Sequence, residues 1–151
     1  MTSVSYTPAV PYVGHPVRAP FVPFPLVCFT LAFATDIAYW QTANLMWQNF
    51  SEWLLFAGLV VGAVAVLLGI VDLFRASAVA VRPPLLQTIA YLVVLALGIL
   101  NSFVHSGDGW TAVVPNGLIT SAVTFVAILI TVFLAPPRTY RFPNAGGRLD
   151  D

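Results

Sequence analysis

The sequence predicts an all-α, polytopic membrane protein, a four-transmembrane-helix bundle with both termini in the cytoplasm. Four apolar stretches fill most of the 151 residues, and each approaches the roughly 20 residues that a membrane-spanning helix needs. Hydrophobic residues make up 59% of the chain and charged residues only 8%, whereas soluble domains average about 25% charged residues. The third observation is the placement of the arginines, which all lie on one side of the four stretches.

Hydropathy and proline together set the boundaries of the elements. We expect four helices, at about residues 23–40, 53–74, 85–104 and 117–135. They form a transmembrane domain, 23–135, which follows a Pro-rich N-terminal segment, 1–22. Pro136 and Pro137 end the fourth helix because proline cannot continue a helix. The remaining residues, 136–151, are expected to form a flexible cytoplasmic tail.

The arginines determine the predicted orientation. They lie in the N-terminal segment, the second connection and the C-terminal tail, as Arg18, Arg75, Arg82, Arg138, Arg141 and Arg148. The first connection (41–52) and the third (105–116) contain none. By the positive-inside rule, both termini and the middle connection are therefore cytoplasmic. The four tryptophans lie on the opposite side, which is typical of an aromatic belt at the outer interface.

Small residues form a second pattern within the helices. In the second helix, Gly58, Gly62, Ala65 and Gly69 recur at spacings of three and four and so share one face. Gly98 and Gly117 lie on the corresponding faces of the third and fourth helices. Small side chains allow membrane helices to approach closely, because packing rather than hydrophobicity drives their association. We expect these faces to point inward and to bring the helices together as a compact bundle.

Polar residues on the inward faces form two groups at opposite ends of the predicted bundle. The candidate outer polar cluster contains Asp36, Asn101, His105 and Asp108, and the candidate inner polar cluster contains His15, Asp72, Arg75 and Gln87. Asp72 lies three residues before Arg75, a spacing that favours an ion pair along the helix. His15 and His105 lie on opposite sides of the membrane, so they cannot share one haem or metal ion within a monomer.

Asp36 is the most informative of these residues. A carboxylate within a membrane helix costs roughly 2.5–3.5 kcal/mol on insertion scales, so it needs a partner or a wet cavity. One interpretation is a proton-handling or ligand-binding acid paired with His105. The other is a hydrogen bond to Asn101 or Tyr39 that holds the helices in register. The sequence leaves both open.

Several function classes are disfavoured. There is no basic stripe, so nucleic-acid binding is not expected. A lone Cys28 permits neither an internal disulfide nor a cysteine-rich metal site. Signatures of serine hydrolases, zinc proteases, P-loop proteins and dinucleotide-binding enzymes are absent. We therefore predict a protein that is not an enzyme, with no catalytic residues, no metal site and no cofactor.

Several of these residues also match a family pattern. A His-Pro pair (His15, Pro16) precedes the first helix, and a Phe-Pro pair (Phe24, Pro25) stands at its start. An acid lies late in the first helix (Asp36) and another ends the second (Asp72). A run that begins in the third helix and continues into the third connection contains Asn101, His105, Asp108 and Trp110. Over roughly residues 14–141, the chain resembles the bacterial membrane proteins grouped as domain of unknown function 2231.

The resemblance implies a four-helix protein of the bacterial inner membrane, and some members of the family are associated with redox modules. It thus implies a membrane anchor or an electron-transfer partner. Members of the family often carry histidines where this chain has Arg18, Gln87 and Phe142, and their absence weighs against a haem or metal site.

The predicted function is a non-enzymatic membrane anchor or a subunit of a larger complex. Its expected partners are the lipid bilayer and either further copies of the chain or a redox protein. Two alternatives stay open: a redox membrane subunit that binds haem b or quinone, and a small proton-handling or transport protein that uses Asp36 and His105.

Overall fold

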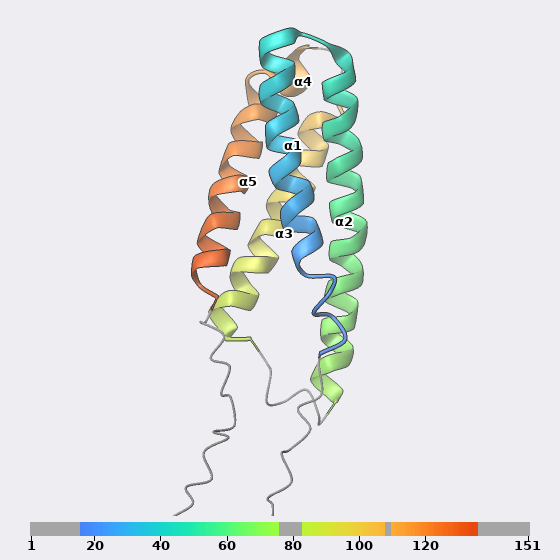
Figure 1. Cartoon of the computed structure of the whole chain (residues 1–151), viewed down its shortest axis with the longest axis vertical. Coiled ribbons are helices and arrows are strands. Elements are labelled where there is room, and N and C mark those ends of the chain that lie inside the picture. Colours follow the sequence, from blue (N-terminus) through green and yellow to red (C-terminus); the bar gives the residue numbers. More distant parts are fainter. Residues whose placement is uncertain (1–15, 76–82, 108–109, 136–151) are drawn as a thin grey trace, which may run out of the picture.

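The computed structural model describes residues 16–75, 83–107 and 110–135, and these residues form a helical bundle (Figure 1). The elements are α1 (Pro23–Thr42), α2 (Leu45–Phe74), α3 (Leu85–His105), the short α4 (Trp110–Val113) and α5 (Asn116–Phe133). Within this described part there is no β-strand. Four helical segments are long and apolar enough to cross a membrane, the last of them formed by α4 and α5 together. The predicted all-α, four-helix membrane fold is confirmed.

The four long helices form a closed ring. α1 packs against α2 and α5, and α3 packs against the same two helices on the other side. Consecutive long helices are therefore neighbours, as short connections favour. α2 is the longest and extends beyond the others at one end of the bundle (Figure 1). We call this end, where Asp72 lies, the Asp72 end, and the opposite one, where Asp36 lies, the Asp36 end.

The predicted first connection, 41–52, is wrong. α1 continues to Thr42 and α2 already begins at Leu45, so the turn contains only two residues. Ala43 ends α1 in the left-handed conformation (φ 52°), and its N–H donates to the Tyr39 carbonyl at 2.7 Å. Asn44 starts α2 as its N-cap, because its side-chain oxygen accepts from the Met46 N–H at 3.0 Å.

Burial explains this error. Gln48 and Ser51 lower the hydropathy of residues 41–52 and suggest a loop, yet both side chains face the interior and are buried. A polar residue that faces the bundle interior has the same hydropathy as one in a loop. α2 consequently has 30 residues, about 45 Å at 1.5 Å per residue, and spans a bilayer with its headgroup regions.

The small-residue faces lie inside the bundle, except at Gly69, which is partly exposed and lies next to Arg18 of the N-terminal segment. Gly58, Gly62, Gly98 and Gly117 are buried, and Ala65 is 2% exposed. The Phe29 ring of α1, itself 1% exposed, lies between Gly58 of α2 and Gly98 of α3. A Cβ atom at either glycine would come within 2.5–2.6 Å of the ring. The two glycines thus provide the space that Phe29 fills at the centre of the core.

The outer surface is apolar and the tryptophans gather at the Asp36 end. Large hydrophobic side chains on every long helix are exposed, as expected for a surface that faces lipid. Trp40, Trp47, Trp53 and Trp110 are 36–70% exposed. Trp110 also packs on Tyr39, with ring centroids 5.5 Å apart. This arrangement fits an interfacial aromatic belt.

Candidate functional site

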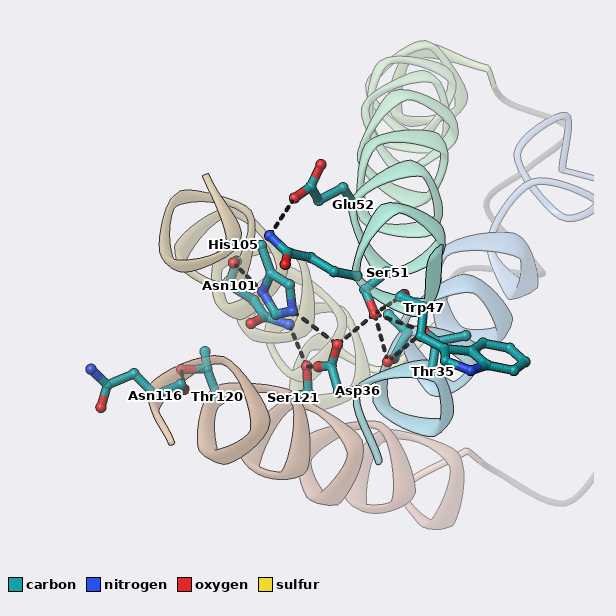
Figure 2. A network of polar contacts seen from close by, with 12 residues as sticks. Thr35, Asp36, Trp47, Ser51, Glu52, Asn101, His105, Asn116, Thr120 and Ser121 are labelled. Atoms are coloured by element: carbon teal, nitrogen blue, oxygen red, sulfur yellow. Dashed lines mark hydrogen bonds and ion pairs between the residues drawn. The ribbon is translucent and has the colours of Figure 1, made fainter. Parts of the chain in front are cut away.

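The site is built around Asp36, which is completely buried between the four long helices (Figure 2). α1 supplies Asp36, α2 supplies Ser51, α3 supplies Asn101 and His105, and α5 supplies Ser121. All five side chains are at most 1% exposed. We call these five residues the Asp36 network. Each long helix contributes to it, so its geometry depends on the assembled bundle.

Both carboxylate oxygens of Asp36 are bonded. Oδ1 lies 2.9 Å from His105 Nε2 and accepts from Ser51 Oγ at 2.5 Å. Oδ2 accepts from Ser121 Oγ, also at 2.5 Å. The three partners come from α3, α2 and α5. The carboxylate of α1 is thereby tied directly to each of the other long helices.

The second ring nitrogen of His105, Nδ1, also has a partner. Nδ1 lies 3.0 Å from the Asn101 carbonyl oxygen, which can only accept, so Nδ1 carries a hydrogen. A second proton must lie between Nε2 and Asp36 Oδ1, because two bare acceptors would repel. The pair is either imidazolium with carboxylate or imidazole with carboxylic acid. It is electrically neutral in both cases, which suits a membrane interior.

Further hydrogen bonds orient the two serines. Asn101 Nδ2 donates to Ser121 Oγ at 2.8 Å, which directs the serine hydrogen toward Asp36. Thr35 Oγ1 lies 2.7 Å from Ser51 Oγ. Asn101 therefore acts on Asp36 through Ser121, and the expected direct bond from Asn101 or Tyr39 is replaced by bonds from the two serines and His105.

Two buried amide oxygens border the network without a partner among the described residues. They are Asn101 Oδ1 and Gln48 Oε1. Gln48 Nε2 donates to Glu52 Oε1 at 3.2 Å. Gln48 thus connects the interior to the half-buried carboxylate of Glu52, which is next in the chain to the exposed Trp53. Glu52 is also close enough to His105 to interact with it electrostatically.

At the Asp36 end, Tyr39 of α1 and Ala112 and Val113 of α4 form a small apolar cluster beside the network. Gly117 at the start of α5 has a specific role here. A Cβ at this position would lie 2.6 Å from the Ala112 carbonyl oxygen and 2.9 Å from His105 Cε1. Its lack of a side chain therefore lets α5 begin directly beside the imidazole.

The residues predicted for the outer cluster are largely together. Asp36, Asn101 and His105 converge, whereas Asp108 lies outside the described residues. Sequence reasoning missed Ser51, which fell in a predicted loop, and did not single out Ser121. The signal for Ser121 was its position four residues after Gly117 on the inward face of the last helix.

The predicted inner cluster is only partly assembled. Asp72, 5% exposed, lies 3.8 Å from Arg75 Nη1, so the predicted ion pair is present. Its carboxylate also accepts from the backbone N–H groups of Val17 and Arg18, at 3.3 and 3.4 Å. Gln87 is half-buried on α3 and makes no hydrogen bond to this group, and His15 lies outside the described residues.

The donor set does not fit haem b or a metal ion at His105. A ring nitrogen that ligates iron must present its lone pair, but Nδ1 is protonated and Nε2 faces Asp36. Across residues 16–75, 83–107 and 110–135, no group of three or more His, Cys, Asp or Glu side chains is placed to hold a metal ion. What the arrangement can do is hold helices together and retain one proton.

Comparison with protein families identifies the family of this chain. The family model described as "Predicted membrane protein (DUF2231)" matches residues 14–142, which is most of the chain. No curated protein and no solved structure matches. The matched range begins just before the described residues, includes all four membrane-spanning segments and contains both Asp36 and Asp72. The chain therefore belongs to the DUF2231 family of predicted membrane proteins.

Proposed function

We propose that this protein is a non-enzymatic membrane anchor, or a subunit of a larger membrane complex. One observation carries the proposal: the buried Asp36 carboxylate is bonded by side chains from each of the other three long helices. Both oxygens of the Asp36 carboxylate are bonded to side chains of the protein itself. This arrangement favours a preassembled structural core over a site that a substrate enters.

Energetics support the same function. Hydrogen bonds between membrane helices contribute on average about 0.6 kcal/mol, and at most about 1.7 kcal/mol. Three such bonds to one carboxylate are enough to define how α1 is rotated and how deep it lies relative to its neighbours. The lateral surface is meanwhile apolar and exposed. A rigid module with an apolar surface is suited to holding a partner in the bilayer.

The test is the composition of the protein isolated from native membranes. A tagged chain at its native expression level is solubilised mildly and weighed by native mass spectrometry. We expect a stoichiometric assembly with a partner or with further copies. An unrelated four-helix membrane protein, solubilised in the same way, controls for non-specific association. Recovery of free monomer alone, with no associated chain, would contradict the proposal.

The proposal includes a location in the bacterial inner membrane with both termini in the cytoplasm. It is supported by Arg18 and Arg75, which lie together at the Asp72 end, and by the tryptophans at the other end. Fusions of the C-terminus to alkaline phosphatase should be inactive, and fusions to green fluorescent protein should fluoresce. The reverse pattern would invert the orientation.

A second candidate is a small proton-handling protein that uses Asp36 and His105. The observation in its favour is that His105 Nε2 lies 2.9 Å from Asp36 Oδ1 inside the bundle, a distance at which one proton can pass between them. The hydrogen bond from buried Gln48 to half-buried Glu52 continues the series of polar side chains from this region toward the surface of the protein. Protons could then exchange through a water at the unpartnered Gln48 oxygen.

Proton flux into proteoliposomes tests this candidate. With a potassium diffusion potential and an internal pH dye, wild-type protein should conduct above empty vesicles. Asp36→Asn should reduce this flux at least about tenfold, because an amide cannot take part in the shared proton. Arg75→Gln, at the far end, is the control and should conduct normally. Equal flux in Asp36→Asn and wild type would eliminate the candidate.

A further inference from the structure

Glu52 lies at the boundary between the polar start of α2 and its apolar remainder. Residues 54–71 contain no polar side chain and span about 27 Å at 1.5 Å per residue, close to the roughly 30 Å of a hydrocarbon core. Asp72 follows this run at one end, and Glu52 and Trp53 precede it at the other. Tryptophan side chains are enriched where the hydrocarbon meets the headgroups. The Glu52 carboxylate is therefore placed at this border.

The Glu52 carboxylate has no cationic partner among the described residues. Its Oε1 accepts a hydrogen bond from Gln48 Nε2 at 3.2 Å, and within the described part of the chain Oε2 has no hydrogen bond and neither oxygen forms an ion pair. Figure 2 shows the carboxylate at the edge of the Asp36 network, on the side away from Asp36. His105 already pairs with Asp36, and the connections at the Asp36 end contain no lysine or arginine. A cation for Glu52 must therefore come from outside the chain, and a second copy in the same orientation cannot supply it.

Two aromatic rings adjoin this carboxylate on the surface of α2. Glu52, Trp53 and Phe56 line a hollow of about 330 Å³. The rings of Trp53 and Phe56 are both exposed and stand nearly perpendicular, with centroids 6.0 Å apart and an interplanar angle of 87°. The face of an aromatic ring attracts a cation, that of tryptophan most strongly, and a carboxylate beside it accepts a charge-assisted hydrogen bond. The hollow therefore combines the two kinds of group that recognise an alkylammonium ion.

An apolar stripe continues from the hollow toward the middle of the bilayer. Val60, Val64 and Leu67 follow Phe56 at spacings of four, four and three residues and so share one face of α2. All four side chains are exposed. From Phe56 to Leu67 the stripe is about 16 Å long at 1.5 Å per residue, close to half of a 30 Å hydrocarbon core. The hollow and the stripe together match an amphiphile that has an ammonium headgroup and an acyl chain one leaflet deep.

We propose that Glu52, Trp53 and Phe56 form a binding site for the primary ammonium group of phosphatidylethanolamine, with an acyl chain of the lipid along the apolar stripe. The ammonium donates to Glu52 Oε2 while its charge lies against the Trp53 ring. The hydrogen bond from Gln48 holds the carboxylate in place before the lipid arrives. A lipid is favoured over a basic side chain of a partner protein because the hollow continues into a stripe of acyl-chain length. This proposal is independent of the proposed anchor role.

The experiment is a lipid titration of the delipidated full chain in detergent, followed by native mass spectrometry. Wild type should bind one molecule of phosphatidylethanolamine at least about fivefold more tightly than phosphatidylglycerol, which has no amine. Glu52→Gln should weaken the binding of phosphatidylethanolamine at least about tenfold, because it removes the charged acceptor. Trp53→Leu should weaken it about threefold, because it removes the aromatic face. Trp40→Leu is the matched control: this side chain is also exposed at the Asp36 end but does not line the hollow, so the affinity should change less than about twofold.

Three outcomes would overturn the site. Wild-type affinity in Glu52→Gln would show that the carboxylate does not bind the ammonium group. Equal affinity of wild type for phosphatidylethanolamine and phosphatidylglycerol would show that the amine is not recognised. A carbodiimide cross-link in native membranes from Glu52 to a lysine would assign the hollow to a partner protein, because this chain contains no lysine. Trp53→Leu keeps the test decisive if Glu52→Gln fails to fold, because the Trp53 side chain is exposed and lies outside the core.

Discussion

Replacing Asp36 by alanine is expected to lower the free energy of unfolding by about 3 kcal/mol. The substitution leaves His105 Nε2 and the hydroxyls of Ser51 and Ser121 without their acceptor in a buried site. Each buried group without its partner costs about 1–3 kcal/mol, and the membrane values for such bonds lie at the low end. Asp36→Asn keeps one acceptor oxygen and should cost less, about 1–2 kcal/mol.

Equilibrium unfolding in mixed micelles, followed by circular dichroism, measures the effect. Glu52→Gln is the matched control because this carboxylate is only half-buried and accepts one bond, from Gln48. We expect it to change the stability by less than about 1 kcal/mol. If Asp36→Ala unfolds within about 0.5 kcal/mol of wild type, the network contributes little to the fold and the anchor proposal loses its main support.

The second large effect is expected at Gly98. A Cβ here would lie 2.5 Å from Cζ of Phe29, and the ring cannot move away because Gly58 of α2 confines its other edge. Overpacking of a filled core costs about 1–3 kcal/mol. Gly98→Ala should therefore destabilise the bundle by about 2 kcal/mol, although alanine is the better helix former by up to about 1 kcal/mol.

A double-mutant cycle distinguishes the clash from a general helix effect. Phe29→Leu shortens the side chain and should recover at least half of the loss in Gly98→Ala, since the two residues are in contact. Gly69→Ala is the control. A Cβ at this position would lie 3.5 Å from the nearest atoms, which belong to Arg18, and this is an ordinary van der Waals contact. No destabilisation is therefore expected. Additive effects of Gly98→Ala and Phe29→Leu would show that the steric explanation is incorrect.

The pairing of Asp36 with His105 could be predicted from the sequence, because both lie on inward faces at similar distances from the same membrane surface. Their role beyond the pairing stays a prediction. The bonds of Ser51 and Ser121 to Asp36 could not be predicted in the same way. A serine or threonine hydroxyl on a membrane helix often bonds to the backbone of its own helix, as those of Thr120 and Thr124 do here. Only the positions of neighbouring helices decide which hydroxyl meets a carboxylate.

Asp72 gives a related case. Its ion pair with Arg75 follows from a spacing of three residues in one helix. Its bonds to the N–H groups of Val17 and Arg18 join residues more than fifty positions apart. Backbone donors are the same in every residue except proline, so no pattern in the sequence indicates which of them an acid will bond.

The sequence by itself determined the number of membrane-spanning helices and the inward position of their glycines. Lipid offers no hydrogen bonds to the backbone, so long apolar stretches must become helices, and residue spacing then defines their faces. The tertiary structure alone decided where α2 begins and which side chains surround Asp36. These features depend on the relative rotation and depth of separate helices, which many small packing contacts set together.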